Sequence, residues 1–106
     1  MFFEFRHYRT RPGQRENWVR LMEESILPFQ LSKGMVALGS FVGQEEDDLY
    51  VWIRRFASEE ERERLCKAVY ETDYWRNEIA PQVEQMLDRS RTQVVRLEAT
   101  PKSVIQ

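Results

Sequence analysis

The sequence predicts an α+β fold of the ferredoxin-like kind, with its elements in the order β, α, β, β, α, β. Four segments of the 106-residue chain alternate between side-chain types with the two-residue period of a strand. Between them, apolar residues recur at the three-residue and four-residue spacings of amphipathic helices. Two strand-helix-strand units with right-handed crossovers place four strands in one antiparallel sheet and the helices on one face of it. We therefore expect a single domain over residues 1–106.

The first strand is predicted over residues 2–9 and ends at the Arg-Pro-Gly turn of residues 11–13, since proline lacks a backbone donor and glycine tolerates unusual backbone angles. The two sides of this strand differ in chemistry. By the alternation of a strand, Phe3, Phe5 and His7 share one side, whereas Glu4, Arg6 and Tyr8 share the other. We expect the apolar side to pack against the helices and the amphipathic side to face a twin subunit.

A helix is predicted over residues 14–27. Trp18, Leu21, Met22 and Ile26 recur at helical spacing there, and charged residues lie between them. We expect the helix to end at Pro28, which lacks the N–H that would continue it.

Residues 35–42 and 49–56 are predicted to form a hairpin, with Gly39 bulging or thinning its first strand. The acidic loop at residues 45–48 is interpreted as a solvated hairpin tip in preference to a cation site. The second hairpin strand repeats the asymmetry of the first strand of the chain. Its apolar side carries Leu49, Val51 and Ile53, and its amphipathic side carries Tyr50, Trp52 and Arg54.

A second helix is predicted from Ser58, whose hydroxyl and the Glu61 carboxylate form a capping box, to about residue 71. It would bury Cys66 as a small apolar side chain. A further helical stretch carries Trp75 on its apolar stripe and is expected to kink or restart at Pro81. The last strand is predicted over residues 92–98, followed by a tail.

Composition excludes several classes of function. Lysine and arginine number 16 against 18 aspartate and glutamate residues, so no cationic surface for nucleic acid is expected. The longest uncharged stretch, residues 34–44, is far shorter than the roughly 20 residues that span a bilayer, so no membrane association is expected. Cys66 is the only cysteine, which favours a reducing, cytoplasmic location.

Metals and cofactors have little support in the sequence. His7 is the only histidine, which argues against a zinc site, and a haem is conceivable only through that residue. We expect His7 to be a structural imidazole facing the helices. The sequence has no glycine-rich phosphate loop and no nucleophile elbow. We predict no metal and no cofactor.

The amphipathic sides of the first and third strands predict a site. A carboxylate between two guanidinium groups stays ionised, and the arginines could stabilise an oxyanion on a substrate. A structural ion pair at a subunit interface is the alternative interpretation, and the aromatic wall beside it could be simple packing. The candidate catalytic residues are Glu4, Arg6 and Arg54, and the candidate substrate-binding residues are Tyr8, Tyr50 and Trp52.

Four motifs in order resemble a known family. They are the opening FEFRHY of residues 3–8, the Arg-Pro-Gly of residues 11–13, the third strand at 51–56 with the charged helix after it, and the Tyr-Trp pair at 74–75. Together they are similar to NIPSNAP proteins over about residues 2–98. The resemblance implies a dimeric α+β barrel, an architecture shared with small cofactor-independent monooxygenases and haem-degrading relatives. It implies no known reaction and assigns no role to His7.

Two functions follow as hypotheses. The first is a homodimer, or a higher oligomer, that binds a small aromatic or conjugated organic molecule in a barrel cavity, with cofactor-independent oxygenase or isomerase activity as its enzymatic form. The alternative is a non-catalytic homo-oligomeric interaction module, in which the charged sheet face serves only to specify self-association.

Overall fold

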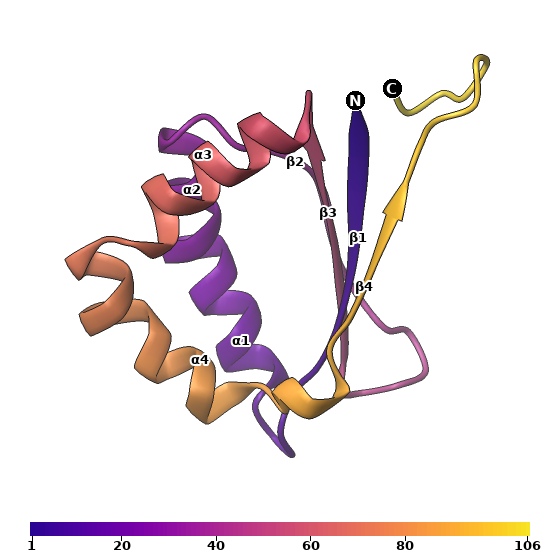
Figure 1. Cartoon of the computed structure of the whole chain (residues 1–106). Coiled ribbons are helices and arrows are strands. Elements are labelled where there is room, and N and C mark those ends of the chain that lie inside the picture. Colours follow the sequence, from indigo (N-terminus) through magenta and orange to yellow (C-terminus); the bar gives the residue numbers. More distant parts are fainter.

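The computed structural model describes all 106 residues and contains one four-stranded antiparallel sheet. The strands are β1 (Phe2–Arg9), β2 (Val36–Val42), β3 (Leu49–Phe56) and β4 (Gln93–Leu97). They are ordered β2-β3-β1-β4. β3 therefore lies between β1 and β2, the strands that precede and follow the first helical arm. Figure 1 shows the helices together on one side of this sheet and no helix on the other. The predicted fold class is therefore confirmed.

The helical layer consists of two bent arms. The first arm is α1 (Arg15–Leu21), a π-helical turn η1 (Met22–Ile26) and α2 (Leu27–Ser32). The second arm begins with α3 (Glu59–Tyr70) and continues, after a break, with the π-helical turn η2 (Trp75–Ile79) and α4 (Ala80–Met86). A short 3-10 helix η3 (Arg89–Arg91) leads into β4. The predicted cap of α3 is present, since the Ser58 hydroxyl accepts a hydrogen bond from the Glu61 N–H at 3.1 Å.

The prediction that the first helix ends at Pro28 is wrong, because the helix continues to Ser32. The reason is the π-helical turn that precedes the proline, where Leu27 N–H donates to the Met22 carbonyl five residues back. The wider turn accommodates the proline ring, which would otherwise clash with the carbonyl four residues earlier. The same device precedes Pro81, where the Ala80 N–H donates to the Trp75 carbonyl.

The hairpin has the bulge expected at Gly39. The register between β2 and β3 shifts between Ala37 and Ser40, and Gly39 has a φ of 132°. That angle lies in the region that side chains disfavour. An added Cβ would also come within 2.5 Å of the Phe41 ring. Glycine is therefore required at this bulge.

The side of the sheet that faces the helices is the opposite of the predicted one. Tyr8, Tyr50 and Trp52 belong to the main buried cluster, together with Trp18 of α1 and Val83 of α4. Strand alternation then turns the odd-numbered residues of β1 and β3 to the side without helices. His7 accordingly lies on the open face, next to the Phe5 ring at 5.0 Å, and not beneath a helix.

The open face is mostly apolar, and no helix covers it. Register places Phe5 opposite both Ile53 and Val95, and places Phe41 opposite Val51. Phe41 and Val95 are 53% and 48% exposed. The charged side chains predicted for this face lie on the other side of the sheet, so the expectation that Arg6 faces a twin subunit is wrong.

Candidate functional site

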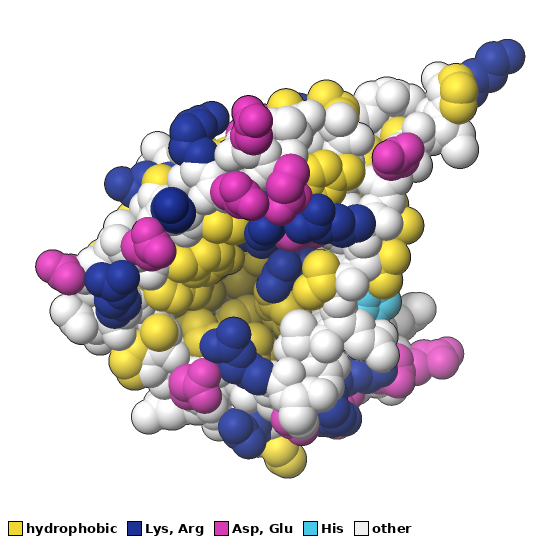
Figure 2. All heavy atoms as spheres, in the orientation of Figure 1, with side chains coloured by type: hydrophobic (Ala, Val, Ile, Leu, Met, Phe, Trp, Pro, Cys, Tyr) yellow, Lys and Arg dark blue, Asp and Glu magenta, His cyan; other side chains and the backbone are white.

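A cavity of about 530 Å³ lies between the sheet and the helical layer. Figure 2 shows its opening as a hollow with hydrophobic side chains inside and Lys or Arg side chains at its rim. The cavity wall combines aromatic and aliphatic side chains with arginines and is lined by Arg6, Tyr8, Trp18, Met22, Ile26, Gln30, Trp52, Arg54, Arg62, Cys66, Tyr70, Trp75, Val83, Leu87, Arg89 and Thr92. A largely apolar cavity with a few polar groups is typical of a small-molecule site.

A buried ion pair forms one end of the cavity. Arg54 of β3 and Glu4 of β1 are 2% and 3% exposed. The Arg54 guanidinium donates to the Glu4 Oε1 from Nη2 at 2.7 Å and from Nε at 3.0 Å. β1 and β3 are neighbours, and their register sets Glu4 directly opposite Arg54. Strand pairing alone therefore brings the two charges together.

Helical side chains complete the partners of Arg54. Its Nη1 donates to the Gln30 side-chain oxygen at 3.1 Å and to the Tyr70 hydroxyl at 2.9 Å, and lies 3.4 Å from the Met35 sulfur. The guanidinium also lies over the Trp52 ring, 5.1 Å from its centroid. All three nitrogens of Arg54 are thus engaged, and it joins the sheet to both helical arms.

The protonation states of this pair follow from its surroundings. Burial alone would raise the pKa of Glu4, but the charge and hydrogen bonds of Arg54, and then those of Arg6, lower it below its ordinary value of 4.5. Burial would likewise lower the pKa of Arg54, but Tyr70 and the Glu4 carboxylate outweigh it and raise that pKa. Both groups are charged at neutral pH.

Arg6 is a second guanidinium beside the same carboxylate. Its Nη1 donates to Glu4 Oε1 at 3.1 Å, and its Nε donates to the Tyr8 hydroxyl at 2.7 Å. The side chain is 20% exposed and lines the cavity. One carboxylate is therefore shared by two guanidinium groups, which leaves a positive charge at the cavity wall.

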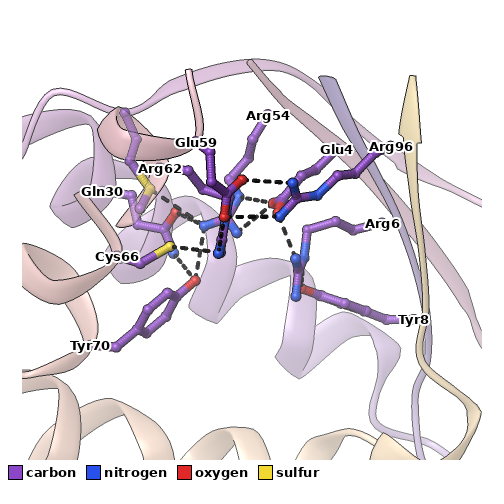
Figure 3. Close-up of polar contacts among 11 residues, drawn as sticks. Glu4, Arg6, Tyr8, Gln30, Arg54, Glu59, Arg62, Cys66, Tyr70 and Arg96 are labelled. Carbon is purple, nitrogen blue, oxygen red and sulfur yellow. Dashed lines mark hydrogen bonds and ion pairs between the residues drawn. The ribbon is translucent and has the colours of Figure 1, made fainter. Parts of the chain in front are cut away.

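Helix α3 supplies the opposite wall. Arg62, Cys66 and Tyr70 follow one another at four-residue spacing and line the cavity together. Figure 3 shows Cys66 and Tyr70 reaching toward the site from one side and Arg6 and Tyr8 from the other. The Arg62 Nη1 lies 3.8 Å from the Cys66 sulfur, while its Nε and Nη2 donate to Glu59.

Two indole groups of the wall have no hydrogen-bond partner in the protein. They are the Nε1–H groups of Trp18 and Trp52, and both side chains are only 2% exposed. Buried N–H groups are paired in most proteins, because an unpaired one costs about 1–3 kcal/mol. Both indoles are packed against Tyr8, at ring-centroid distances of 5.8 and 6.4 Å.

Four of the six predicted site residues line the cavity: Arg6, Tyr8, Trp52 and Arg54. Glu4 lies behind the two arginines and orients them. Tyr50 is fully buried beside Trp18, and its hydroxyl hydrogen-bonds to the Ser40 hydroxyl at 2.6 Å. Burial raises the pKa of Tyr50 to about 12, so it is a neutral core residue and not part of the cavity wall.

None of the cavity residues that lie on helices was among the predicted site residues. They include Gln30, Arg62 and Tyr70, three of the eight polar or hydroxyl-bearing side chains that line the cavity. The four-residue spacing of Arg62, Cys66 and Tyr70 was the available signal, since it places an arginine, a thiol and a phenol on one helix face. No sequence pattern pointed to Gln30, because it lies beyond Pro28, where the helix was expected to end.

No group of three or more His, Cys, Asp or Glu side chains is arranged to hold a metal ion. His7, the one histidine, lies on the open face and away from the cavity. No helix of the chain is both long and apolar enough to cross a membrane.

This sheet order, with every helix on one face and a cavity between the layers, defines an α+β protein of the ferredoxin-like class. The NIPSNAP family profile matches residues 3–101, and the chain belongs to the NIPSNAP family. The resemblance drawn from the motifs is thereby confirmed. No curated protein sequence matches the chain significantly.

Solved structures with the same fold include two NIPSNAP proteins. One from Agrobacterium tumefaciens has a TM-score of 0.88 at 20% identity, covering 99% of this chain and 98% of its own. An uncharacterised NIPSNAP domain protein from Burkholderia xenovorans has a TM-score of 0.84 at 14% identity, covering 97% and 98%. A structure described as an antibiotic biosynthesis monooxygenase has a TM-score of 0.69 at 17% identity, covering 95% and 100%. At these identities the likeness concerns the fold alone.

Proposed function

We propose that this NIPSNAP protein binds a small aromatic or conjugated organic molecule in the cavity between its sheet and its helices. The observation that carries the proposal is the cavity itself, whose wall places aromatic rings next to guanidinium groups. Tyr8, Trp52 and Trp75 offer flat apolar surfaces, while Arg6 and Arg62 offer hydrogen-bond donors from opposite sides of the same cavity. Such a wall suits a planar ligand with one polar end.

The chain contains its own reporter of occupancy. Cys66 is the only cysteine, it is partly buried, and it lines the cavity. A molecule in the cavity should therefore slow the alkylation of this thiol, whereas a molecule on the open face should not.

The test is native mass spectrometry of the purified protein, combined with the rate of Cys66 alkylation by N-ethylmaleimide. We expect a co-purified or added aromatic compound to increase the mass by a fixed amount and to slow alkylation in proportion to occupancy. Alkylation at an unchanged rate while the compound is bound would place the ligand elsewhere and contradict the proposal.

The proposal extends to enzymatic turnover of the ligand. In a cofactor-independent oxygenation or isomerisation, the substrate passes through an enolate or phenolate, and guanidinium groups in a low-dielectric site stabilise such an oxyanion. Arg6 is the group best supported for that role, because Arg54 has its nitrogens engaged by protein partners. Consumption of dioxygen or a change in ligand absorbance, lost in Arg6→Gln, would establish turnover.

We also propose that the protein is a homodimer, formed through the open face of the sheet. Phe5, Phe41, Ile53, Val95 and Leu97 make this face apolar, and apolar patches of this kind mark interaction sites. A second copy offers the same apolar surface, so a two-fold contact would match like with like. A cytoplasmic location remains part of the proposal, since a single cysteine suits a reducing compartment.

The second candidate function is a non-catalytic interaction module. The open apolar face favours it, although the charged residues first expected to specify self-association lie on the cavity side. The two candidates differ in what Arg6→Gln should do. Ligand binding should weaken under the first candidate, whereas under the second no ligand binds and assembly is unchanged.

A further inference from the structure

The charges at the cavity are unbalanced. Four arginines line it, namely Arg6, Arg54, Arg62 and Arg89, and no aspartate or glutamate does. The carboxylates that pair with these arginines do not line the cavity. Glu4 pairs with both Arg6 and Arg54, Glu59 with both Arg62 and Arg96, and Glu84 with Arg89. Three carboxylates thus serve five arginines, four of which line the cavity, so the cavity favours a negative charge.

The guanidinium groups differ in how many of their hydrogens are free. Arg54 donates from all three of its nitrogens to protein atoms. The Nη2 of Arg6 has no partner in the protein, and the Nη1 of Arg62 has only the Cys66 sulfur at 3.8 Å. A thiol is a weak acceptor. Arg6 and Arg62 therefore retain more donor capacity at the cavity than Arg54, which already makes four hydrogen bonds to protein oxygens.

The other polar groups of the wall are also donors. The Tyr8 hydroxyl accepts from Arg6, and the Tyr70 hydroxyl accepts from Arg54 and Gln30, so each hydroxyl keeps its own proton to donate. The Trp18 and Trp52 indoles are pure donors without partners. The Gln30 side-chain oxygen, the main acceptor of the wall, is already used by Arg54.

We propose, building on the proposed function, that the ligand is an anion: a conjugated molecule whose carboxylate, sulfonate or enolate oxygens are held by Arg6 of β1 and Arg62 of α3. The apolar body lies against the aromatic wall, and the two arginines reach its charged end from opposite layers of the fold. A neutral molecule of the same shape leaves both guanidinium groups without an acceptor in a partly desolvated site.

The test uses two fluorescent dyes that differ only in charge. 8-Anilino-1-naphthalenesulfonate carries a sulfonate, and N-phenyl-1-naphthylamine has the same rings without it. Trp18, Trp52 and Trp75 are the only tryptophans and all line the cavity, so energy transfer from tryptophan to dye reports binding near it. Protection of Cys66 from N-ethylmaleimide separates dye in the cavity from dye on the open face.

The variants are Arg6→Gln and Arg62→Gln, with Arg96→Gln as the matched control. Arg96 donates to the Glu59 carboxylate as Arg62 does, but it does not line the cavity. We expect each of the first two variants to weaken sulfonate-dye binding about tenfold, the effect of one lost hydrogen bond to a charged group. Binding of the neutral dye should change less than about twofold, and the control should alter neither dye.

The outcomes separate the two proposals. If both dyes protect Cys66 and the arginine variants weaken them equally or not at all, the ligand is not selected as an anion, and only this inference fails. If neither dye protects Cys66, the cavity does not take conjugated molecules and the proposed function fails with it. Circular dichroism and the thermal midpoint confirm that each variant is folded, and Arg62→Gln decides the question if Arg6→Gln does not fold.

Discussion

The two faces of the sheet differ in their surroundings: the helices cover one face and leave the other uncovered. On the cavity face, Glu4 and Arg54 are almost completely buried and every charged atom of Arg54 has a partner. On the open face, side chains such as Phe41 and Val95 are apolar and about half exposed. The same strands supply both faces, and adjacent residues differ in which one they join. Apolar character alone therefore does not decide which face of a sheet the helices cover.

The difference follows from the side chains that each face presents for packing against a helix. Tyr8, Tyr50 and Trp52 bury large ring areas against Trp18 and its neighbours, so the amphipathic face supplies much of the core. The buried charges are tolerated because Gln30 and Tyr70 bring polar partners from the helices. The open face is mostly apolar and needs few such partners, which is why we propose it as the site of the two-fold contact.

The largest effect is expected from Arg54→Met, which removes the buried cation from the cavity face. Glu4 would lose its closest partner, and Gln30 and Tyr70 would lose theirs. Breaking a buried ion pair in this way costs about 3–5 kcal/mol in the free energy of unfolding, measured by urea denaturation. The double variant Glu4→Gln, Arg54→Met should recover part of that loss, and a double variant less stable than Arg54→Met would contradict this account of the pair.

A smaller effect is expected from acid. The pKa of Glu4 is lower in the folded protein than its ordinary value of 4.5, so the fold favours the ionised form. Its contribution is fully present above pH 4.5 and is lost as the pH falls through the folded-state pKa. The wild-type free energy of unfolding should therefore decline below that pH more steeply than in Glu4→Gln. Parallel pH profiles for the two proteins would show that Glu4 is not stabilised as an anion.

A charged substitution on the open face should change the oligomeric state and leave the fold of the chain intact. Val95→Asp introduces charge at the proposed two-fold contact, and we expect light scattering after size exclusion to give the mass of one chain in place of two. Val94→Asp is the matched control, because Val94 is the same residue type, is 44% exposed against 48% for Val95, and points to the cavity side. A monomeric wild type, or equal dissociation in both variants, would rule out the open face as the interface.

The smallest effect is expected from Arg96→Gln. Arg96 stands opposite Glu4 in the β1–β4 register, yet it is half exposed and pairs with the exposed Glu59. Water already solvates both groups, so the pair adds little to stability. We expect no resolvable change in the urea midpoint, in contrast to Arg54→Met. A large loss in Arg96→Gln would mean that charge and not burial decides which arginines matter.

The sequence by itself determined the order of the elements, most of their bounds and the strand residues that share a side. The first and third strands follow directly from alternation, the cap at Ser58 from its capping box, and the bulge at Gly39 from an isolated glycine in a strand. Four of the six candidate site residues could be grouped at the cavity because strand parity places them together. These features depend on local sequence, which is why a pattern predicts them.

Only the tertiary structure decided which side faces the helices. Alternation sorts side chains into two sets, but the path of the crossovers determines which set is covered, and Arg6, Tyr8 and His7 were assigned to the wrong sides for that reason. The position of Gln30, beyond Pro28, likewise depends on a π-helical turn that no residue pattern predicts. The partners of a buried charge come from distant parts of the chain, so Gln30 and Tyr70 become visible only when the layers are packed together.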